Sequence, residues 1–427
     1  MTNSSLKKKR SNKKHGRQSF WRRHRIFKWI LIVLALLVAL MFLKSAFSTW
    51  QTNKQQSELA PFYDTTGLSL DGPLGEVVRW ENLGDEVVGG IGYRVLYRTE
   101  KADGTNTFTS GMVFVPYNPA QNRPVLAWAH GTLGLGDECT PSRVKDPANI
   151  SWLGDALSQG WVVTATDYAG QGTPGPQEYL VGPAEAHDVI NSVRAARNME
   201  QTNASNEYVV WGHSQGGNSA LFTASNSASY APELSLKGTV ASAPAAELPE
   251  LLDAQYDTAT GWVIGSIVAA TWPAVNPALN VNDVLSSAGQ KTYQKLANQC
   301  IQKSALAGLM RTALKQQIFS TNPIEVPAWK DMAVAQSGPD LAANQPLLVV
   351  ESKADKVVLP ATTALYIQQA CAAGSNLQSL WIDKGNHEVI PKLTYPQVIP
   401  WIKDRFQGLA NQSSCSQPPA VTPATPV

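Results

Sequence analysis

Six short apolar runs, separated by segments with helical periodicity, constrain the fold of this 427-residue chain more than any other feature. Each run is apolar at consecutive positions, which is typical of strands in a parallel sheet that helices cover on both faces. The repeated strand–helix order predicts an α/β fold with a mostly parallel, doubly wound sheet. The runs are PVLAWAH (124–130), WVVTATD (161–167), EYVVWG (207–212), KGTVASA (237–243), PLLVVES (346–352) and LQSLWI (377–382).

Two segments without this alternation complete the expected domain. Residues 92–99 and 107–116 are rich in β-branched and aromatic residues and predict a hairpin. Between residues 246 and 340 the strand–helix alternation stops, and 258–282 contain no charge. Two prolines interrupt the uncharged stretch, so it predicts an inserted helical cap over the sheet rather than a membrane span.

The chain is expected to divide into a core that the cap interrupts, with extra segments at both ends. Residues 45–75 are polar and interrupted by Gly and Pro, and we interpret them as a stalk that leads into the domain. The tail is rich in Ser, Pro and Thr, so we expect it to be flexible except where Cys415 tethers it. The predicted order is a basic cytoplasmic segment (1–28), a transmembrane anchor or signal sequence (29–44), a stalk (45–75), the first part of the core (76–245), the cap (246–340), the second part of the core (341–410) and a flexible tail (411–427).

Charge is distributed unevenly along the chain. Residues 1–54 hold 13 of the 35 Lys and Arg and no acid, which leaves 22 bases against 33 acids in the remainder. The remainder is therefore acidic, which excludes a body that binds nucleic acid. A content of 43% hydrophobic and 16% charged residues excludes a largely disordered chain.

The basic leader precedes the apolar run WILIVLALLVALMFL (29–43), which is just long enough to span a bilayer. The excess of bases before the run predicts that the body lies on the extracytoplasmic side of the membrane. A cleaved signal is the alternative, since Ala46-Phe47-Ser48 is a small-x-small pattern, and it predicts a secreted or periplasmic protein. A buried core helix is the third interpretation.

The four cysteines fit export to an oxidising compartment. Two disulfides are expected, with three possible pairings, and free buried thiols are the alternative. No pair has the C-x-x-C spacing of a zinc or redox motif. The cysteines are Cys139, Cys300, Cys371 and Cys415.

The sharpest motif is the G-x-S-x-G of residues 212–216, centred on Ser214. It directly follows a predicted buried strand and continues into a predicted helix, which is the context of a nucleophile elbow. A serine hydroxyl at its ordinary pKa is a poor nucleophile and needs a neighbouring base. A Gly-rich turn with an incidental serine is the alternative.

One histidine follows the motif in the chain, His387, just after the last predicted strand. The order serine, acid, histidine predicts His387 as the catalytic base. Asp355 follows the strand 346–352 and is the predicted acid that orients the imidazole. Glu351 and Asp383 remain alternative acids.

Two backbone amides are expected to bind the oxyanion that forms during acyl transfer. The first is the N–H of Gln215, the residue after the nucleophile. The second comes from the loop after residues 124–130, where Thr132 is chosen and Leu133 is the alternative. His130 in the same loop is interpreted as structural. Asp167 is interpreted either as part of the pocket wall or as a helix cap or loop hydrogen bond.

Apolar and aromatic residues above this site predict a pocket for an apolar acyl group, with Tyr168, Trp262 and Trp272 as its lining. Packing of the cap against the sheet is the alternative role for the two tryptophans. No glycine-rich nucleotide fingerprint and no spacing of metal ligands is present, so neither a cofactor nor a metal is expected.

At these motifs the chain resembles the α/β-hydrolases and, more narrowly, the secretory lipase family. The resemblance implies the Ser214–Asp355–His387 triad, a cap with an acyl tunnel, and disulfides that pair Cys139 with Cys300 and Cys371 with Cys415. The matching segments are WAHGTLGLGDECTPS (128–142), DYAGQGTPGPQEYLVG (167–182), VVWGHSQGGNSALF (209–222), ADKVVLP (354–360) and GNHEVI (385–390).

The predicted function is therefore that of a serine lipase or esterase acting on acylglycerols or other apolar acyl esters. A peptidase or acyltransferase of the same fold is one alternative, and a catalytically inactive binding protein is another. The expected partners are a small-molecule or lipid ester and the membrane that holds the N-terminal segment.

Overall fold

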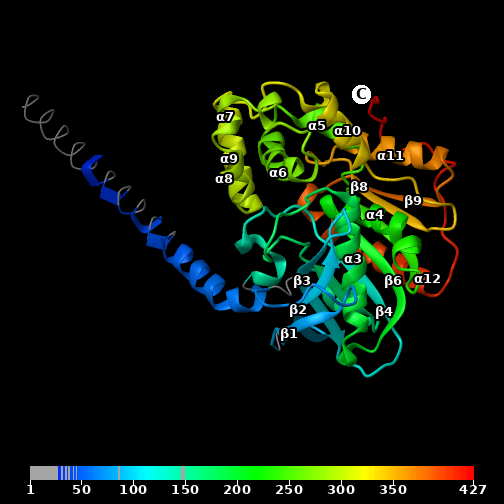
Figure 1. The fold of residues 1–427 in the computed structure, drawn as a ribbon. Helices are drawn as coiled ribbons and strands as arrows, with labels where there is room; N and C mark the ends of the chain where they lie inside the picture. Colours follow the sequence, from blue (N-terminus) through cyan, green and yellow to red (C-terminus); the bar gives the residue numbers. More distant parts are fainter. Residues whose placement is uncertain are drawn as a thin grey trace, which may run out of the picture. The chain divides into compact units, whose positions relative to one another are not determined.

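The computed structural model describes residues 27–29, 32–33, 36, 39–41, 43–44, 46–84, 87–144, 146 and 150–427. The chain divides into two compact units, Met1–Glu58 and Leu59–Val427. In the first unit, residues 46–58 are helical. The second unit contains the sheet and its covering helices (Figure 1).

A nine-stranded sheet forms the centre of the second unit, in the order β1-β2-β3-β5-β4-β6-β7-β8-β9. The pairs β1–β2, β2–β3 and β3–β5 are antiparallel, and all the others are parallel. The strands are β1 (Val77–Asn82), β2 (Gly90–Glu100), β3 (Asn106–Pro116), β4 (Arg123–Ala129), β5 (Val162–Thr166), β6 (Ala204–His213), β7 (Ser235–Ser242), β8 (Leu347–Ser352) and β9 (Leu377–Ile382). The predicted hairpin and all six apolar runs are therefore strands, whereas β1 was not predicted.

Helices cover both faces of the sheet. Val125 of β4 and Val210 of β6 face α3, while Leu126 and Val209, one residue away, face α2 and α12. Successive residues of a strand point to opposite faces, so a strand covered on both sides is apolar throughout. The helices beside the core strands are α2 (Leu153–Ser158), α3 (Gly182–Arg197), α4 (Gln215–Tyr230), α11 (Pro360–Ala372) and α12 (Ile390–Phe406).

The helical cap is inserted between β7 and β8, and Figure 1 shows it to one side of the sheet. Its longest helix contains Pro273 in its last turn. The missing N–H of a proline there removes a backbone hydrogen bond only near the end of the helix. The cap helices are α5 (Leu248–Gln255), α6 (Ala259–Val275), α7 (Ser287–Gln290), α8 (Tyr293–Ala297), α9 (Ile301–Ala313) and α10 (Pro327–Ala335). Short 3₁₀ turns complete the fold: η1 (Asp137–Cys139), η2 (Pro141–Arg143), η3 (Glu200–Thr202), η4 (Val281–Asp283), η5 (Pro323–Glu325) and η6 (His387–Val389).

The predicted stalk, residues 45–75, differs from the structure in its second half. Within the second unit, residues 59–63 are helical, and Phe62 and Tyr63 are buried there. Tyr63 also shares a hydrogen bond of 2.7 Å with Ser142. This part is therefore packed on the domain rather than leading into it, because burial of two adjacent aromatic rings outweighs the polar residues around them.

The predicted flexible tail, residues 411–427, also packs on the body. The backbone N–H of Ser414 donates to Leu377 O at 2.8 Å, and that of Ala424 donates to Ala361 O at 2.9 Å. The side chain of Asn411 donates to Asn376 O at 2.7 Å. The expected tether at Cys415 is present as a disulfide with Cys371. The expectation of flexibility was wrong for the hydrogen-bonded residues on either side of Cys415, because composition does not show that their backbone groups meet those of β9 and α11.

No helix among the described residues has the length and apolar character needed to cross a membrane. Seven of the sixteen residues of the predicted anchor (29–44) lie outside the described residues, as do residues 1–26 of the basic segment. The anchor, its orientation and its cleavage therefore stay predictions.

Candidate active site

The turn between β6 and α4 holds Ser214 in a strained backbone conformation, with φ of 60° and ψ of −118°. Non-glycine residues rarely adopt positive φ, and such strain is typical of a nucleophile elbow. A Cβ atom at Gly212 would overlap the carbonyl oxygen of Gly216, and one at Gly216 would overlap that of Ala129. The two glycines therefore allow the close approach that raises Ser214 above the end of the sheet.

His387 and Asp355 form a buried pair at the carboxyl ends of β9 and β8. His387 Nδ1 lies 2.6 Å from Asp355 Oδ2, and the Asp355 side chain is fully buried. Asp355 Oδ1 also accepts the backbone N–H of Val357 at 2.7 Å. A carboxylate held in this way can fix the tautomer of the ring and leave Nε2 available for proton transfer.

The two alternative acids have other partners. Glu351 is buried in β8 and accepts hydrogen bonds from Ser352 N and Thr363 Oγ1, each at 2.6 Å. Burial and the nearby charge of Asp355 raise the pKa of Glu351 well above its ordinary value, which favours the neutral acid. Asp383 is exposed and pairs with Lys353 at 2.9 Å. Of the three candidates, Asp355 has the bond to His387.

Sequence reasoning assigned no role to His213, the variable residue before the serine. Its ring lies 4.6 Å from that of His387, and His213 Nε2 lies 3.0 Å from His387 O. A carbonyl oxygen only accepts, so His213 carries its proton on Nε2. Burial lowers the pKa of His213 well below its ordinary value, so the ring is neutral and holds the backbone of His387 in place.

The loop after β4 passes directly against the nucleophile. A Cβ atom at Gly131 would lie 3.3 Å from Ser214 Cβ, and Thr132 lines the same cavities as Ser214. Gln215 is the first residue of α4, so its N–H has no intrahelical acceptor and lies at the positive end of the helix dipole. These two backbone segments are suited to binding an oxyanion.

His130 and Asp167 support this loop from below. His130 Nδ1 lies 2.7 Å from Gly131 O, as a structural histidine should. Asp167 is buried and accepts from Ser110 Oγ at 2.6 Å and from Ser142 N at 2.9 Å. Of its two interpretations, these contacts favour the hydrogen bond to a loop for Asp167.

Glu185 of α3 is a buried acid that the sequence did not single out. Its Oε1 accepts from the Gln215 side chain at 2.6 Å and from Leu180 N at 2.9 Å, and its Oε2 bonds Ser219 Oγ. The residue after the nucleophile is thereby tied to the wall of the pocket. Burial raises the pKa of Glu185 to about 7, because its hydrogen bonds to Ser219, Gln215 and Leu180 offset only part of the loss of hydration.

We expect Glu185 to make the folded protein less stable as pH rises. A folded-state pKa of about 7 against an ordinary 4.5 means that the folded protein binds the extra proton between these values. The free energy of unfolding then falls as the pH rises from 4.5 to 7. Since each unit of pKa shift corresponds to about 1.4 kcal/mol, the total fall is about 3 kcal/mol. Glu185→Gln keeps the neutral hydrogen-bonding shape and should remove this part of the slope.

Urea unfolding of both proteins at pH 4.5 and pH 8 measures the effect. The difference in free energy of unfolding, variant minus wild type, should be more positive at pH 8 than at pH 4.5. Two parallel stability–pH curves would show that Glu185 does not titrate between these values.

Two cavities meet at Ser214. The wider, of about 370 Å³, is lined by His387, His213 and Lys392 together with Trp128, Trp152 and other residues. The narrower, of about 60 Å³, runs under the cap and is almost entirely apolar. Its lining includes Leu248, Leu251, Leu252, Tyr256, Ile264, Val268, Trp272, Phe319 and Val358. Ser214, Thr132, Ile264 and Val357 line both cavities.

The three aromatic residues predicted to line the pocket have different positions. Trp272 lines the narrow cavity, and its Nε1 donates to Tyr179 O at 3.0 Å. Trp262 is buried in the packing of the cap, with Nε1 donating to Gln316 O at 3.1 Å, and lines neither cavity. Tyr168 lies beneath the site, where its hydroxyl donates to His130 O at 3.2 Å.

Trp262 and Tyr168 thus lie outside the lining of these two cavities, whereas Tyr168 lines a separate small cavity together with Glu185 and Gln215. Their roles in substrate binding stay predictions. Tyr179 lines the narrow cavity instead and shares a 2.7 Å hydrogen bond with Thr132 Oγ1. Tyr179 lies in the segment 167–182 that carries the family resemblance, but it was not singled out.

The model of the secretory lipase family matches residues 143–414, which is more than half of the chain. The chain belongs to the secretory lipase family. A secreted triacylglycerol lipase of Malassezia globosa is 26% identical, over 78% of this chain and 74% of that protein. A probable inactive lipase of Mycobacterium tuberculosis is 24% identical, over 74% and 73% of the two chains.

Among solved structures, lipase A of Candida antarctica in its closed state superposes with a TM-score of 0.69 at 18% identity, covering 85% of this chain and 89% of that one. This likeness shows the same α/β-hydrolase fold. The family membership, the relatives and the shared fold together indicate that this secretory lipase is a carboxylic ester hydrolase.

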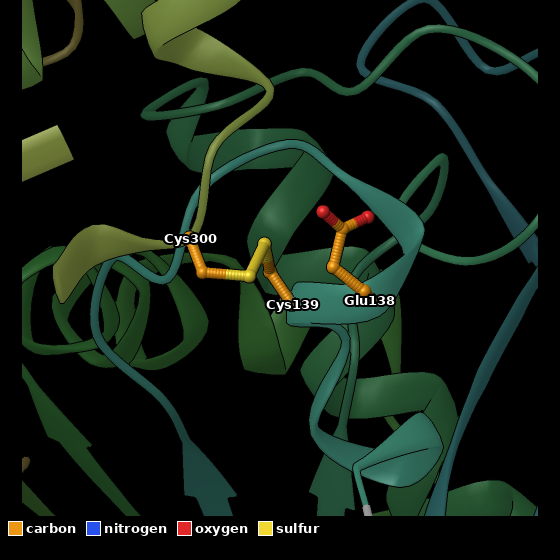
Figure 2. Close-up of side chains that lie close together, drawn as sticks. All are labelled: Glu138, Cys139 and Cys300. Carbon is orange, nitrogen blue, oxygen red and sulfur yellow. A yellow bond between two sulfur atoms is a disulfide. The ribbon is translucent and has the colours of Figure 1, made fainter. Parts of the chain in front are cut away.

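Two disulfides brace the lipase body. Cys139–Cys300 joins the loop after β4 to the start of α9 in the cap, and Cys371–Cys415 joins α11 to the tail. These are the pairings that the resemblance implied. Figure 2 shows Glu138 beside the first bond, and these three residues are the one group of possible metal ligands found among the described residues. Both sulfurs are bonded to each other, so no thiolate is available to bind a metal.

We expect Cys139→Ser with Cys300→Ser to cost both stability and activity. The bond closes a separation of 161 residues, for which the loop-entropy relation gives about 5 kcal/mol. The loop that it holds includes Thr132, so turnover should fall even where the variant remains folded.

The matched control is Cys371→Ser with Cys415→Ser. It opens a separation of 44 residues, costs about 4 kcal/mol, and lies away from Ser214. Thermal unfolding and ester hydrolysis at 15 °C measure the two effects. Equal specific activity in both folded variants would contradict a role of the first bond in holding the loop.

Proposed function

We propose that this secretory lipase hydrolyses apolar acyl esters through an acyl-enzyme on Ser214, with His387 as base and Asp355 as its orienting acid. The observation that carries the proposal is the buried His387–Asp355 bond of 2.6 Å beside the strained turn of Ser214. Ser214 and His387 line one cavity, where an ester carbonyl can reach both.

In the first step the Ser214 oxygen attacks the ester carbonyl while His387 Nε2 takes the serine proton. Asp355 stabilises the resulting imidazolium through Nδ1–H. The N–H groups of Gln215 and Thr132 bind the oxyanion. His387 then gives the proton to the leaving alcohol, and a water activated by the same ring releases the acid.

The two cavities suggest how the substrate is arranged. The narrow apolar cavity suits the acyl chain, and the wider, more polar cavity on the other side of Ser214 suits the alcohol. About 60 Å³ corresponds to roughly four to six water-sized groups, and a methylene is of similar size. The proposed preference is therefore for acyl chains of short to medium length.

The proposed place of action is outside the cytoplasm. Disulfides form and persist in oxidising compartments, and the body contains two. The Malassezia globosa relative is described as secreted, which agrees with this proposal.

The proposal is tested with a series of p-nitrophenyl esters from acetate to palmitate. The acyl group that gives the fastest ester hydrolysis is then also tested as its p-nitroanilide. We expect kcat/KM to be highest for about four to eight carbons and the anilide to be turned over far more slowly. Faster cleavage of the amide would favour a peptidase. Failure to react with a fluorophosphonate probe would favour an inactive binding protein of the same fold.

Val268→Phe sharpens the test, because Val268 lines the narrow cavity but not the wide one, and a larger side chain there narrows the first. Turnover of the hexanoate should fall while that of the acetate changes little. An equal loss for both esters would place the acyl chain elsewhere.

A further inference from the structure

Helix α9 exposes a stripe of large apolar side chains to solvent. Leu306, Leu309, Met310 and Leu314 are 61%, 60%, 59% and 69% exposed. Their spacing of three and four residues places them on one side of the helix. Scattered exposed leucines are ordinary, whereas four on one helical face form a continuous surface that marks an interaction site.

The opposite side of α9 is fixed to the cap, so the stripe cannot turn inward. Ser304 and Gly308 are buried there, and a Cβ atom at Gly308 would lie 2.8 Å from Ala259 O of α6. The Arg311 guanidinium lies over the Trp262 ring at 4.8 Å. This close packing against α6 holds the apolar stripe in a single orientation.

The segment around the stripe is strongly cationic. Residues 284–324 contain five bases and no acid, although the chain after residue 54 is acidic overall. Helices α6 and α8, which pack against α9, also contain no acid. The bases are Lys291, Lys295, Lys303, Arg311 and Lys315, and all four lysines are exposed.

We propose that this surface, the cationic cap face (Leu306, Leu309, Met310 and Leu314 with Lys291, Lys295, Lys303 and Lys315), docks the lipase on anionic lipid bilayers. An amphipathic helix with a Leu/Met stripe and flanking bases lies at such an interface, with its apolar side chains at the boundary of headgroups and acyl chains. The lysines meet the anionic headgroups, so the attraction depends on lipid charge.

A second copy of the chain fits this surface less well than a membrane. In a two-fold dimer the same patch faces itself, so the lysines of one copy would face those of the other. Like charges opposed in this way disfavour association, whereas an anionic bilayer neutralises them.

The position of the surface suits delivery of a lipid ester to the site. Ile301, the first residue of α9, lines the wide cavity at Ser214 and His387. Figure 1 shows α7, α8 and α9 together at one end of the cap. A bilayer docked on the cationic cap face would therefore lie against the helix whose first residue lines the wide cavity. The docking itself does not depend on the proposed hydrolysis.

A local label on the full chain tests the proposal, because the basic N-terminal segment could bind the same vesicles and obscure total binding. Ala313→Cys lies within the stripe, and Ala120→Cys is an exposed alanine in the loop before β4. All four native cysteines are in disulfides, so each variant has one reactive thiol. Both are labelled with a fluorophore whose emission shifts to shorter wavelength in lipid.

With vesicles of phosphatidylglycerol and phosphatidylcholine, the label at Ala313→Cys should shift and be quenched by spin-labelled lipid. The label at Ala120→Cys should do neither, and neutral phosphatidylcholine vesicles should have little effect on either. Adding Leu309→Ser and Leu314→Ser should raise the lipid concentration for half-maximal shift at least about tenfold. Replacing Lys291, Lys295, Lys303 and Lys315 with glutamine should do the same.

No shift at Ala313→Cys with anionic vesicles would overturn the proposal. A shift that appears without vesicles and grows with protein concentration would also overturn it, in favour of self-association. Hydrolysis of water-soluble p-nitrophenyl acetate by the same variants reports separately on the site. Loss of docking with full hydrolysis, or the reverse, therefore distinguishes this proposal from the proposed function.

Discussion

Replacing Ser214 with alanine is expected to lower kcat/KM for p-nitrophenyl esters by about 10⁴- to 10⁶-fold. The hydroxyl is the only group of the strained turn that can form the acyl-enzyme, and alanine leaves His387 with no proton to accept. Residual turnover comes from oxyanion binding and from positioning of the ester beside water. The fold should survive, because the backbone strain lies in φ and ψ and alanine replaces serine without adding volume.

The control for this variant is Ser225→Ala, an exposed serine in the same helix α4. It should retain wild-type turnover and fluorophosphonate labelling, while Ser214→Ala loses both. Circular dichroism and thermal unfolding show whether each protein is folded. If folded Ser214→Ala kept more than a tenth of the activity, the acyl-enzyme mechanism would be wrong.

Replacing Asp355 with asparagine is expected to lower kcat about 10⁴-fold, with a smaller effect on KM. The amide is nearly the same size as the carboxylate but can donate to His387 Nδ1. Donation favours the tautomer with its proton on Nε2, which cannot accept the proton of Ser214. The loss of the carboxylate also removes the charge that stabilises the imidazolium.

The two rival acids provide the controls for Asp355. Asp383→Asn should have wild-type activity, because its side chain is 80% exposed and pairs only with Lys353. Glu351→Gln should affect stability more than kcat, since its partners are Ser352 and Thr363. A larger loss of kcat in Glu351→Gln than in Asp355→Asn would reassign the acid of the proposed triad.

Much of the sheet could be predicted because parallel strands carry a local signal. A strand such as β4 or β8 is buried on both faces, so nearly every residue in it is apolar and the run stands out from its neighbours. Strand β1 was missed because it is a half-exposed edge strand, with Arg79 and Glu81 among its residues. The packing of the helical residues 59–63 on the domain was missed, because its two buried aromatic residues, Phe62 and Tyr63, form too short a pattern in a polar segment.

Candidate residues of the site could be predicted where the chemistry leaves a mark in the chain. Gly212 and Gly216 are required by close backbone contacts, and a single histidine follows Ser214. Cavity lining could not be predicted in the same way. Trp262 and Trp272 lie on one helix ten residues apart, yet only Trp272 lines the narrow cavity.

The sequence by itself determined the α/β order of elements, the family resemblance and the identity of Ser214 and His387 as candidates, since each depends on local composition or spacing. Only the tertiary structure decided which of three acids meets His387, that His213 and Glu185 support the site, and that the apolar residues of α9 face solvent. These depend on directions of side chains and on contacts between segments far apart in the chain. Burial and charge at one position are set by those distant neighbours, which no local pattern contains.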